Sequence, residues 1–172
     1  VEMSGLARGF MARRFSRTHE PRVDAANIDC TADWIDGACL MLRRVALDEV
    51  GLFDERFFMY SEDEDVCYRV RQHDWMICYS AAGTATHRGA ASSRRDRAAM
   101  LEQFYRSQML LLAKHRGRAT LAGYKLAMRT VLLLKRLLHP ARVRRAECRE
   151  RLQAFNQADR NLIDKPKEIE RG

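Results

Sequence analysis

Short apolar runs and helical repeats divide the chain into recognisable elements. Two continuous apolar runs, at residues 39–42 and 75–79, predict buried strands. A third, shorter extended piece is expected at residues 85–87. Residues 45–50 are expected to form a short helix, because Gly51 follows directly and can supply a left-handed C-terminal cap. The first half of the chain is thus expected to contain both strands and helices.

A longer helix is predicted to begin after Ser61 and to run to about His73. Its apolar face repeats at i, i+3, i+4 and i+7 and consists of Asp63, Val66, Cys67 and Val70. Four acids in succession, residues 62–65, fill its first turn. Ser61 and Glu64 match a capping box, and acids complement the positive end of the helix dipole. A purely structural role therefore accounts for three of the four acids.

Asp63 differs from its neighbours because it lies on the apolar face of this helix. A carboxylate on the buried side of a helix start, close to other carboxylates, is expected to have a raised pKa. A general base is usually prepared in this way. Asp65 and Arg69, by contrast, are four positions apart and are expected to form an ion pair. A capping role for this turn and a general-base role for Asp63 are compatible, since the cap fixes the turn that orients the Asp63 side chain.

From residue 93 onward the pattern predicts helices. Ser93 and Asp96 fit a second capping box, and the helix after them is expected to end near Gly117. A further helix is expected over residues 119–138, before Pro140. Its apolar face consists of Tyr124, Ala127, Met128, Val131, Leu134 and Leu138, with Lys125, Arg129 and Arg136 on the other side. Because these charges argue against a membrane span, two alternatives stay open: a helix lying in the membrane interface, or a helix packed on its own domain with a solvated basic face.

Composition and charge narrow the partners. The 172 residues, 47% hydrophobic, suffice for one domain with a core. Residues 23–79 carry 13 acids and 5 bases, whereas residues 88–151 carry 17 bases and 4 acids. A block this basic suggests a phosphate-rich partner: a membrane surface, a nucleotide or a nucleic acid. Five cysteines, without a Cys-x-x-Cys pair, favour a reducing compartment over a disulfide framework or a structural zinc site.

A long pattern of spaced residues resembles one enzyme family. It consists of Trp34-x-x-Gly37-Ala38, Arg43-Arg44, Val50-Gly51-x-Phe53-Asp54-Glu55-x-Phe57-Phe58-x-Tyr60-x-Glu62-Asp63-x-Asp65-x-Cys67-x-Arg69, Trp75 and His87. It closely resembles the inverting nucleotide-sugar glycosyltransferases of glycosyltransferase family 2, which have the GT-A fold, and the rhamnosyltransferase-like members look nearest. The resemblance is strong over about residues 33–93. It implies an α/β fold: the C-terminal half of a GT-A-like mixed α/β domain, followed by a helical, basic amphipathic extension.

Four parts are therefore expected along the chain. They are a poorly defined N-terminal segment (residues 1–33), the acceptor-side part of a GT-A-like domain (34–95), a basic helical extension (96–158) and a frayed tail (159–172). The family's first half, which binds the nucleotide and carries an Asp-x-Asp metal motif, is not found. Asp63-Glu64-Asp65 spells Asp-x-Asp, but its position at the head of a helix fits the base motif. The chain thus looks like a C-terminal fragment of an enzyme.

The resemblance also implies roles for single residues. Asp63 would be the catalytic base, taking a proton from an acceptor hydroxyl, and Glu62 would orient that base or support acceptor binding. His87 would bind the divalent metal, Mg²⁺ or Mn²⁺, that neutralises the leaving diphosphate; alternatively, it is a surface histidine. Trp34, Gly37 and Ala38 would line the sugar and acceptor pocket, and Asp65 is placed with them as a substrate-binding residue. Core packing is the preferred role for Trp75.

These observations lead to one interpretation with two competitors. The chain would be a glycosyltransferase, or its C-terminal portion, that moves a sugar from a nucleotide-sugar donor to a lipid-linked or polysaccharide acceptor with inversion. It would act in the cytoplasm, peripherally at the inner face of the cell membrane. The first alternative is a non-catalytic membrane-associated module that uses its basic helices. The second, nucleic-acid binding, is not expected, because the arginines accompany long apolar stripes and no recognised motif appears.

Overall fold

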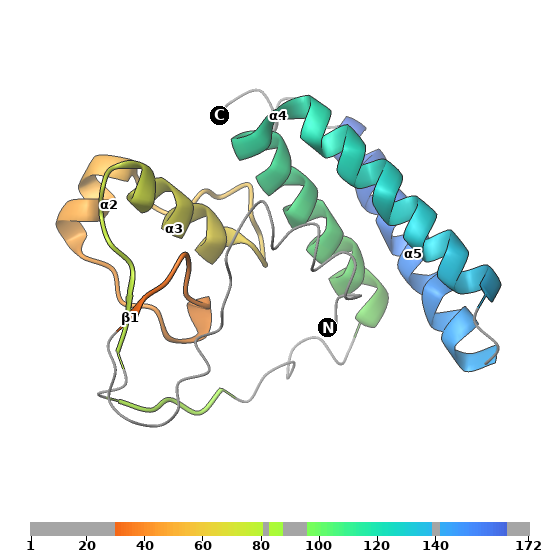
Figure 1. The fold of residues 1–172 in the computed structure, drawn as a ribbon, viewed down its shortest axis with the longest axis horizontal. Coiled ribbons are helices and arrows are strands. Elements are labelled where there is room, and N and C mark those ends of the chain that lie inside the picture. The colour runs from red at the N-terminus through yellow and green to blue at the C-terminus, as the bar shows by residue number, and fades with distance from the viewer. Residues whose placement is uncertain (1–29, 81–82, 88–95, 139–141, 165–172) are drawn as a thin grey trace. The chain divides into compact units, whose positions relative to one another are not determined.

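The computed structural model describes residues 30–80, 83–87, 96–138 and 142–164 (Figure 1). The described chain is mostly helical. Its elements are β1 (Cys30–Thr31), η1 (Gly37–Cys39, a 3-10 helix), α2 (Arg44–Val50), α3 (Glu62–Gln72), β2 (Cys78–Tyr79), α4 (Arg97–Leu138) and α5 (Arg142–Asp164). The expected α/β character is limited to one antiparallel pair, in which Cys30 of β1 lies opposite Tyr79 of β2.

These elements form two compact units. The α3 unit comprises the described residues up to 54 and residues 62–87, and the α4–α5 unit comprises residues 55–61 and those from 96 onward. Each unit has buried side chains of its own. No helix in the described ranges is long and apolar enough to cross a membrane.

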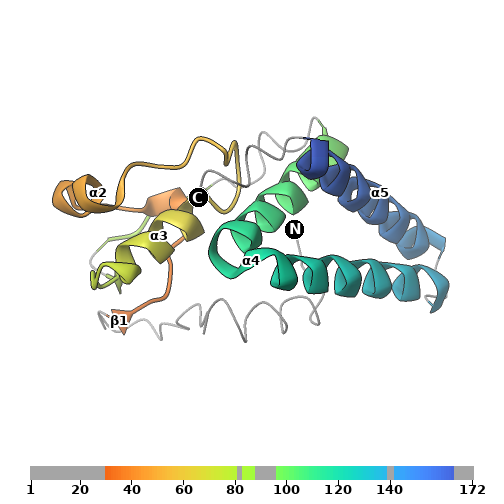
Figure 2. The same cartoon turned by 90° about the horizontal axis from the view of Figure 1, so that it is seen from above.

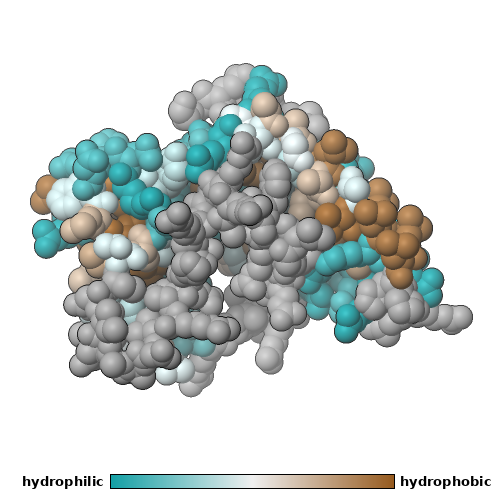
Figure 3. Space-filling model, viewed as in Figure 1, coloured by the Kyte–Doolittle hydropathy of each residue, from teal (hydrophilic) through white to brown (hydrophobic). Residues whose placement is uncertain are grey.

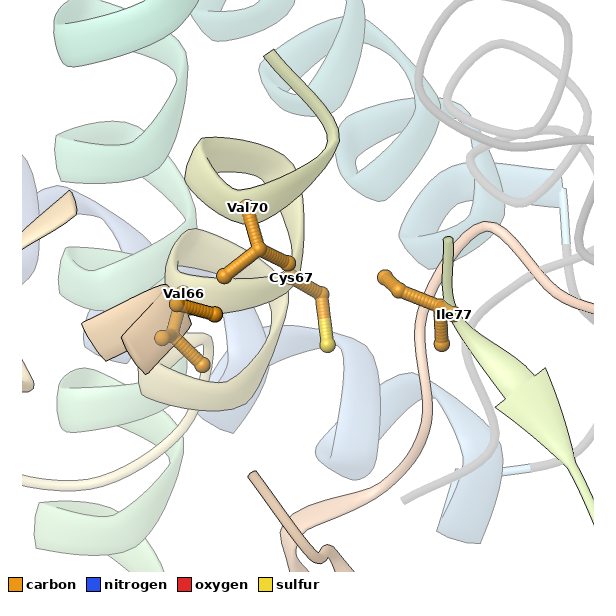
Figure 4. Close-up of a cluster of buried hydrophobic side chains, with 5 residues drawn as sticks. Val66, Cys67, Val70 and Ile77 are labelled. Atoms are coloured by element: carbon orange, nitrogen blue, oxygen red, sulfur yellow. The ribbon is translucent and has the colours of Figure 1, made fainter. Parts of the chain in front are cut away.

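The core of the α3 unit lies against the helix face that the sequence predicted. Val66, Cys67 and Val70 of α3 are buried together with Ala46 of α2 and with Ile77, which directly precedes β2 (Figure 4). Partly buried side chains surround this cluster, which we call the α3 cluster. The helical period therefore identified the three apolar side chains that α3 buries, whereas Asp63, expected on the same face, is only partly buried and Asp65 is fully buried.

Helix α2 also agrees with the prediction, including its end. Gly51 has φ +82°, and its N–H donates to the carbonyl of Leu47 at 2.8 Å. The positive φ explains why glycine follows this helix.

The buried strand expected at residues 39–42 is not formed. Cys39 ends η1, Leu40 is extended, and the side chain of Met41 is 96% exposed. Among the described residues β1 and β2 pair only with each other, so this apolar run has no neighbouring strand. The second expected strand, over residues 75–79, is reduced to β2, and residues 83–87 have no regular structure.

Helix α4 is divided at Gly117, whose φ of +78° and ψ of 174° are not helical. The first arm, residues 97–116, and the second arm, residues 118–138, confirm the two predicted helices, and Figure 2 shows the bend between them. Asp96 caps the first arm, because its Oδ1 accepts from the N–H of Ala99 at 3.0 Å. The expected capping residue Ser93 lies outside the described residues.

The buried side chains of the α4–α5 unit come from both arms of α4 and from α5. They include Leu101, Tyr105, Met109, Leu112, Leu121, Tyr124, Met128, Leu132, Phe155, Ala158 and Leu162. Phe155 is fully buried, and its ring meets Tyr105 edge to face with the centroids 5.3 Å apart. Residues 159–164, which we expected in a frayed tail, are instead helical, and Leu162 is fully buried.

The second arm corrects the expected division into an apolar and a solvated basic face. Leu134 and Leu138, expected on the packed face, are exposed. Lys125 and Arg129, expected on the solvated face, both contact the buried carboxylate of Asp159 in α5, with 2.5 Å between Lys125 Nζ and Asp159 Oδ1. The local repeat could not reveal this arrangement, because Asp159 lies 30 positions after Arg129.

Residues 55–61 belong to the α4–α5 unit although they directly precede α3. The carbonyl of Met59 accepts from Ser107 Oγ at 2.8 Å and from Gln103 Nε2 at 3.5 Å. Gln108 Nε2 donates to Ser61 Oγ at 3.3 Å. Three polar side chains of the first arm of α4 therefore hold the segment that leads into α3.

Candidate active site

Two backbone amides hold the carboxylate of Asp63. Its Oδ2 accepts from the N–H of Gly37 at 2.7 Å, and its Oδ1 accepts from the N–H of Glu64 at 2.8 Å. The donors belong to η1 and α3, so the rotamer is fixed from two elements. Each carboxylate oxygen retains acceptor capacity, and the side chain is only partly buried. The group can therefore accept a further hydrogen bond from a ligand hydroxyl.

The close backbone approach suggested by Gly37 is real, and its partner is Asp63. A Cβ added to Gly37 would lie 3.5 Å from both Cβ and Oδ2 of Asp63, which is ordinary van der Waals contact. Glycine thus leaves open one side of the carboxylate that an alanine would cover. The sequence singled out both residues, 26 positions apart, and the structure brings them together.

Asp36 adds a carboxylate that the sequence analysis missed. It caps η1, with its Oδ1 accepting from the N–H of Ala38 at 2.9 Å. Its charge is close enough to raise the pKa of Glu62. The available signal was an Asp directly before Gly37, a pairing common in turns.

Glu62 and Glu64, in the first turn of α3, have raised pKa values. Burial, followed by the charges of Asp63 and Glu62, raises the pKa of Glu64 to about 7. Burial is also the main cause that raises the pKa of Glu62, assisted by the charges of Asp63 and Asp36 and opposed by a backbone hydrogen bond. A carboxyl group with a pKa near 7 can both donate and accept a proton at neutral pH. The capping box predicted from the sequence assigned Glu64 only a structural role.

The expected capping box of Ser61 and Glu64 is replaced by another arrangement. Ser61 has φ +64°, whereas an N-cap residue is normally extended. Its hydroxyl accepts from Gln108, and the N–H of Glu64 donates to Asp63. Asp63 therefore both caps the turn and presents its carboxylate.

Asp65 has a structural role in place of the expected contact with substrate. Its side chain is fully buried, and its Oδ2 accepts from Arg69 Nε at 2.9 Å, as the four-residue spacing predicted. The Arg69 guanidinium also donates to the carbonyls of Val50 at 2.5 Å, Gly51 at 2.9 Å and Leu52 at 2.7 Å. Asp65 thus positions the arginine that satisfies the carbonyls at the end of α2.

The two tryptophans both pack against the α3 cluster. Trp75 is partly buried, as preferred, and its Nε1 donates to Glu49 Oε2 at 2.8 Å. Trp34 is also partly buried, and it lies three positions before Gly37, the first residue of η1. It keeps some exposed surface near the start of the loop that carries Gly37.

His87 is exposed and lies in a segment without regular structure. Within the part of the chain that the structure describes, no group of three or more His, Cys, Asp or Glu side chains is arranged to hold a metal ion. The described residues therefore do not by themselves fit the divalent metal that the sequence pattern implied.

Comparison with curated proteins identifies relatives that transfer sugars. An N-acetylglucosaminyl-diphospho-decaprenol L-rhamnosyltransferase of Mycobacterium tuberculosis, found in two strains, is 38% identical over 119 residues, or 65% of this chain. A low-salt glycan biosynthesis hexosyltransferase of Haloferax volcanii is 33% identical over 55 residues, which are 32% of this chain and 18% of that protein. The chain is homologous to glycosyltransferases.

This homology covers part of each relative. The chain spans 38% of the length of the rhamnosyltransferases. No protein-family profile matches it, and no solved structure matches it. The homology to the curated relatives confirms the predicted relation to glycosyltransferases at the level of this broad class.

Proposed function

We propose that the chain is the acceptor-side part of an inverting glycosyltransferase with a GT-A fold, belonging to glycosyltransferase family 2. The observation that carries the proposal is the carboxylate of Asp63, which two backbone amides fix at the head of α3 and which stays partly exposed. This arrangement occurs in a chain homologous to rhamnosyl- and hexosyltransferases.

In this proposal Asp63 is the general base. Its carboxylate takes the proton of an acceptor hydroxyl while the hydroxyl oxygen forms a bond to the anomeric carbon of the donor sugar. The bond from that carbon to the nucleoside diphosphate breaks on the opposite face, so the configuration inverts. The hydrogen bond from Gly37 fixes the orientation of the base, which lowers the entropic cost of the step. Glu62 directly precedes Asp63 in the sequence, and Ala38 directly follows Gly37. Both would help to orient the acceptor.

The partners follow from the same proposal. The donor would be a nucleotide sugar, bound mainly by residues beyond this chain, and the acceptor would be a lipid-linked or polysaccharide glycan. The name of the mycobacterial relative specifies a diphospho-decaprenol-linked N-acetylglucosamine. A lipid-linked acceptor would place the enzyme peripherally at the cytoplasmic face of the membrane. His87 would supply one ligand to Mg²⁺ or Mn²⁺, with the other ligands coming from outside the described residues.

Substitution of Asp63 by Asn tests the proposed base. In the full-length protein that carries this chain, Asp63→Asn should lower the turnover number about 10³-fold, because Asn cannot accept the proton. Transfer is measured from a panel of labelled nucleotide sugars to polyprenyl-diphospho-N-acetylglucosamine. Asp48→Asn makes the same chemical change on an exposed carboxylate of α2 and should leave turnover unchanged.

A parallel Glu64→Gln variant separates the two candidate bases in the turn. If Asp63→Asn retains near-normal turnover while Glu64→Gln abolishes it, the base is Glu64 and the assignment of Asp63 is wrong. If neither variant changes the turnover number, the first turn of α3 does not supply the general base. Native tryptophan fluorescence of each variant, made in the 172-residue chain alone, confirms that the α3 unit is folded, since Trp34 and Trp75 both pack in it.

A further inference from the structure

The second arm of α4 exposes a row of leucines. Leu126, Leu133, Leu134, Leu137 and Leu138 are 71%, 43%, 48%, 73% and 76% exposed, respectively. Their spacing places them on one side of the helix. Figure 3 shows this side of the arm as a band of hydrophobic surface. We call it the leucine face, and apolar patches of this kind on soluble proteins usually mark an interaction site.

The α4–α5 unit cannot bury this face by turning the helix. The other side of the arm is packed within the unit through Met128 and Leu132, which are both buried. Lys125 and Arg129 fix the same side to Asp159 of α5. A rotation that buried the leucines would break these ion pairs and uncover the core. The exposure of the leucine face is therefore a property of the folded unit.

Basic side chains lie near the end of α4 and the start of α5. Lys135 near the end of α4 and Arg145 near the start of α5 are exposed. The end of α4 and the start of α5 lie at the same end of this unit (Figure 1). Over residues 133–138 and 142–147 the cations outnumber the single acid, Glu147. Apolar and cationic side chains thus share one end of the unit.

We propose that the leucine face inserts into the interfacial layer of an anionic phospholipid surface, with the cations near the end of α4 and the start of α5 contacting lipid phosphates. Leucines beside Lys and Arg on a helix that lies flat are the features that bind such surfaces. A second copy of the chain is a poorer occupant, because it would bring a second set of the same cations against the first. The inference deepens the proposed function by naming where a lipid-linked acceptor would be met, but lipid binding itself requires no transfer.

Vesicle co-sedimentation tests the inference directly. The chain should sediment with vesicles of phosphatidylglycerol and phosphatidylcholine, and much less with phosphatidylcholine alone. The triple variant Leu133→Gln, Leu134→Gln, Leu137→Gln should lower the partition coefficient about 100-fold, because it removes three partly inserted side chains. Gln has nearly the helix propensity of Leu, so α4 is preserved. The pair Lys135→Gln and Arg145→Gln should lower binding about tenfold, and added salt should reproduce that loss.

A matched control changes exposed apolar residues of the other unit. Met41→Gln, Leu52→Gln and Met76→Gln together should leave vesicle binding unchanged. Circular dichroism verifies the helix content of every variant. Undiminished binding by the leucine variant would overturn the inference, and so would equal losses in the leucine variant and the control.

Analytical ultracentrifugation distinguishes the alternative occupant. If the unmodified chain ignores anionic vesicles but forms a dimer that the leucine variant dissociates, a second copy covers the face and the inference is wrong. If sugar transfer is absent while vesicle binding depends on the leucines, the proposed enzymatic function fails and the membrane inference stands.

Discussion

The two units of this protein are stabilised by different kinds of interaction. The α3 unit buries a cluster of five apolar residues and relies on polar links, foremost the bonds of Arg69 to Asp65 and to three backbone carbonyls. The α4–α5 unit buries a long row of leucines, methionines and aromatic rings. The unit that carries the proposed chemistry thus combines a small apolar cluster with a polar network around Arg69, whereas the α4–α5 unit adds the pairs of Lys125 and Arg129 with Asp159 to a larger apolar core. We expect the stability of the α3 unit to follow charge and pH, and that of the α4–α5 unit to follow packed volume.

The sequence provides separate probes for this comparison. Its two tryptophans, Trp34 and Trp75, both pack in the α3 unit. Tryptophan fluorescence therefore reports on the α3 unit, while far-ultraviolet circular dichroism reports chiefly on α4 and α5, which contain most of the helical residues.

The largest effect is expected from emptying the core of the α4–α5 unit. Phe155→Ala should lower the free energy of unfolding of this unit by about 4 kcal/mol, because a fully buried ring is replaced by a cavity. Thermal unfolding by circular dichroism measures it. Phe58→Ala, at an exposed position of the same unit, is the control and should cost under about 0.5 kcal/mol. An equal shift in the fluorescence transition would show that the units unfold together.

The next effect comes from breaking the polar link of the α3 unit. Arg69→Met should cost about 3 kcal/mol, because it leaves the fully buried carboxylate of Asp65 without its cation. Denaturant unfolding followed by fluorescence measures this loss. Arg44→Met removes an exposed pair with Asp48 at the same spacing and should cost under about 1 kcal/mol. Similar costs for the two variants would contradict the view that the α3 unit depends on this buried network.

The sequence predicted those features of the fold that depend on residues within one helix. The period of α3, its buried face and the pairing of Asp65 with Arg69 follow from spacings within one helix. The prediction of a strand at residues 39–42 was wrong. A strand needs a partner from another part of the chain, and an apolar run does not specify that partner. Met41 shows the error most clearly, since its side chain is almost fully exposed.

For the candidate site, the sequence selected single residues but not their geometry. Asp63 and Gly37 were both selected, yet their hydrogen bond joins positions 26 apart. The raised pKa of Glu64 depends on burial, which no single position in the sequence reveals. In the same way, Lys125 was read as solvated because its buried partner Asp159 belongs to another helix.

The smallest effect concerns the pH dependence of the α3 unit. The pKa of Glu64 is about 7 when folded, compared with an ordinary value of 4.5, so the folded state binds this proton more tightly than the unfolded state. Its contribution to stability is fully present below about pH 4.5 and is lost as the pH rises to about 7. Glu64→Gln should abolish this loss and raise the stability of the α3 unit at pH 8 by about 2 kcal/mol.

Denaturant unfolding at several pH values, followed by fluorescence, measures this slope. Asp48→Asn, on the exposed side of α2, should keep the decline of the unmodified protein. A Glu64→Gln variant that loses stability between pH 5 and pH 8 as steeply as the parent would show that Glu64 is not the source.

The placement of residues 55–61 has a consequence for the order of folding. The segment is synthesised immediately before α3, but the partners of its Met59 carbonyl, Gln103 and Ser107, follow 44 and 48 positions later. On the ribosome, the helix that presents Asp63 therefore emerges before the segment leading into it can acquire its tertiary hydrogen bonds. Those bonds form only after the first arm of α4 has been made. The segment that leads into the proposed catalytic turn thus acquires these hydrogen bonds late in synthesis.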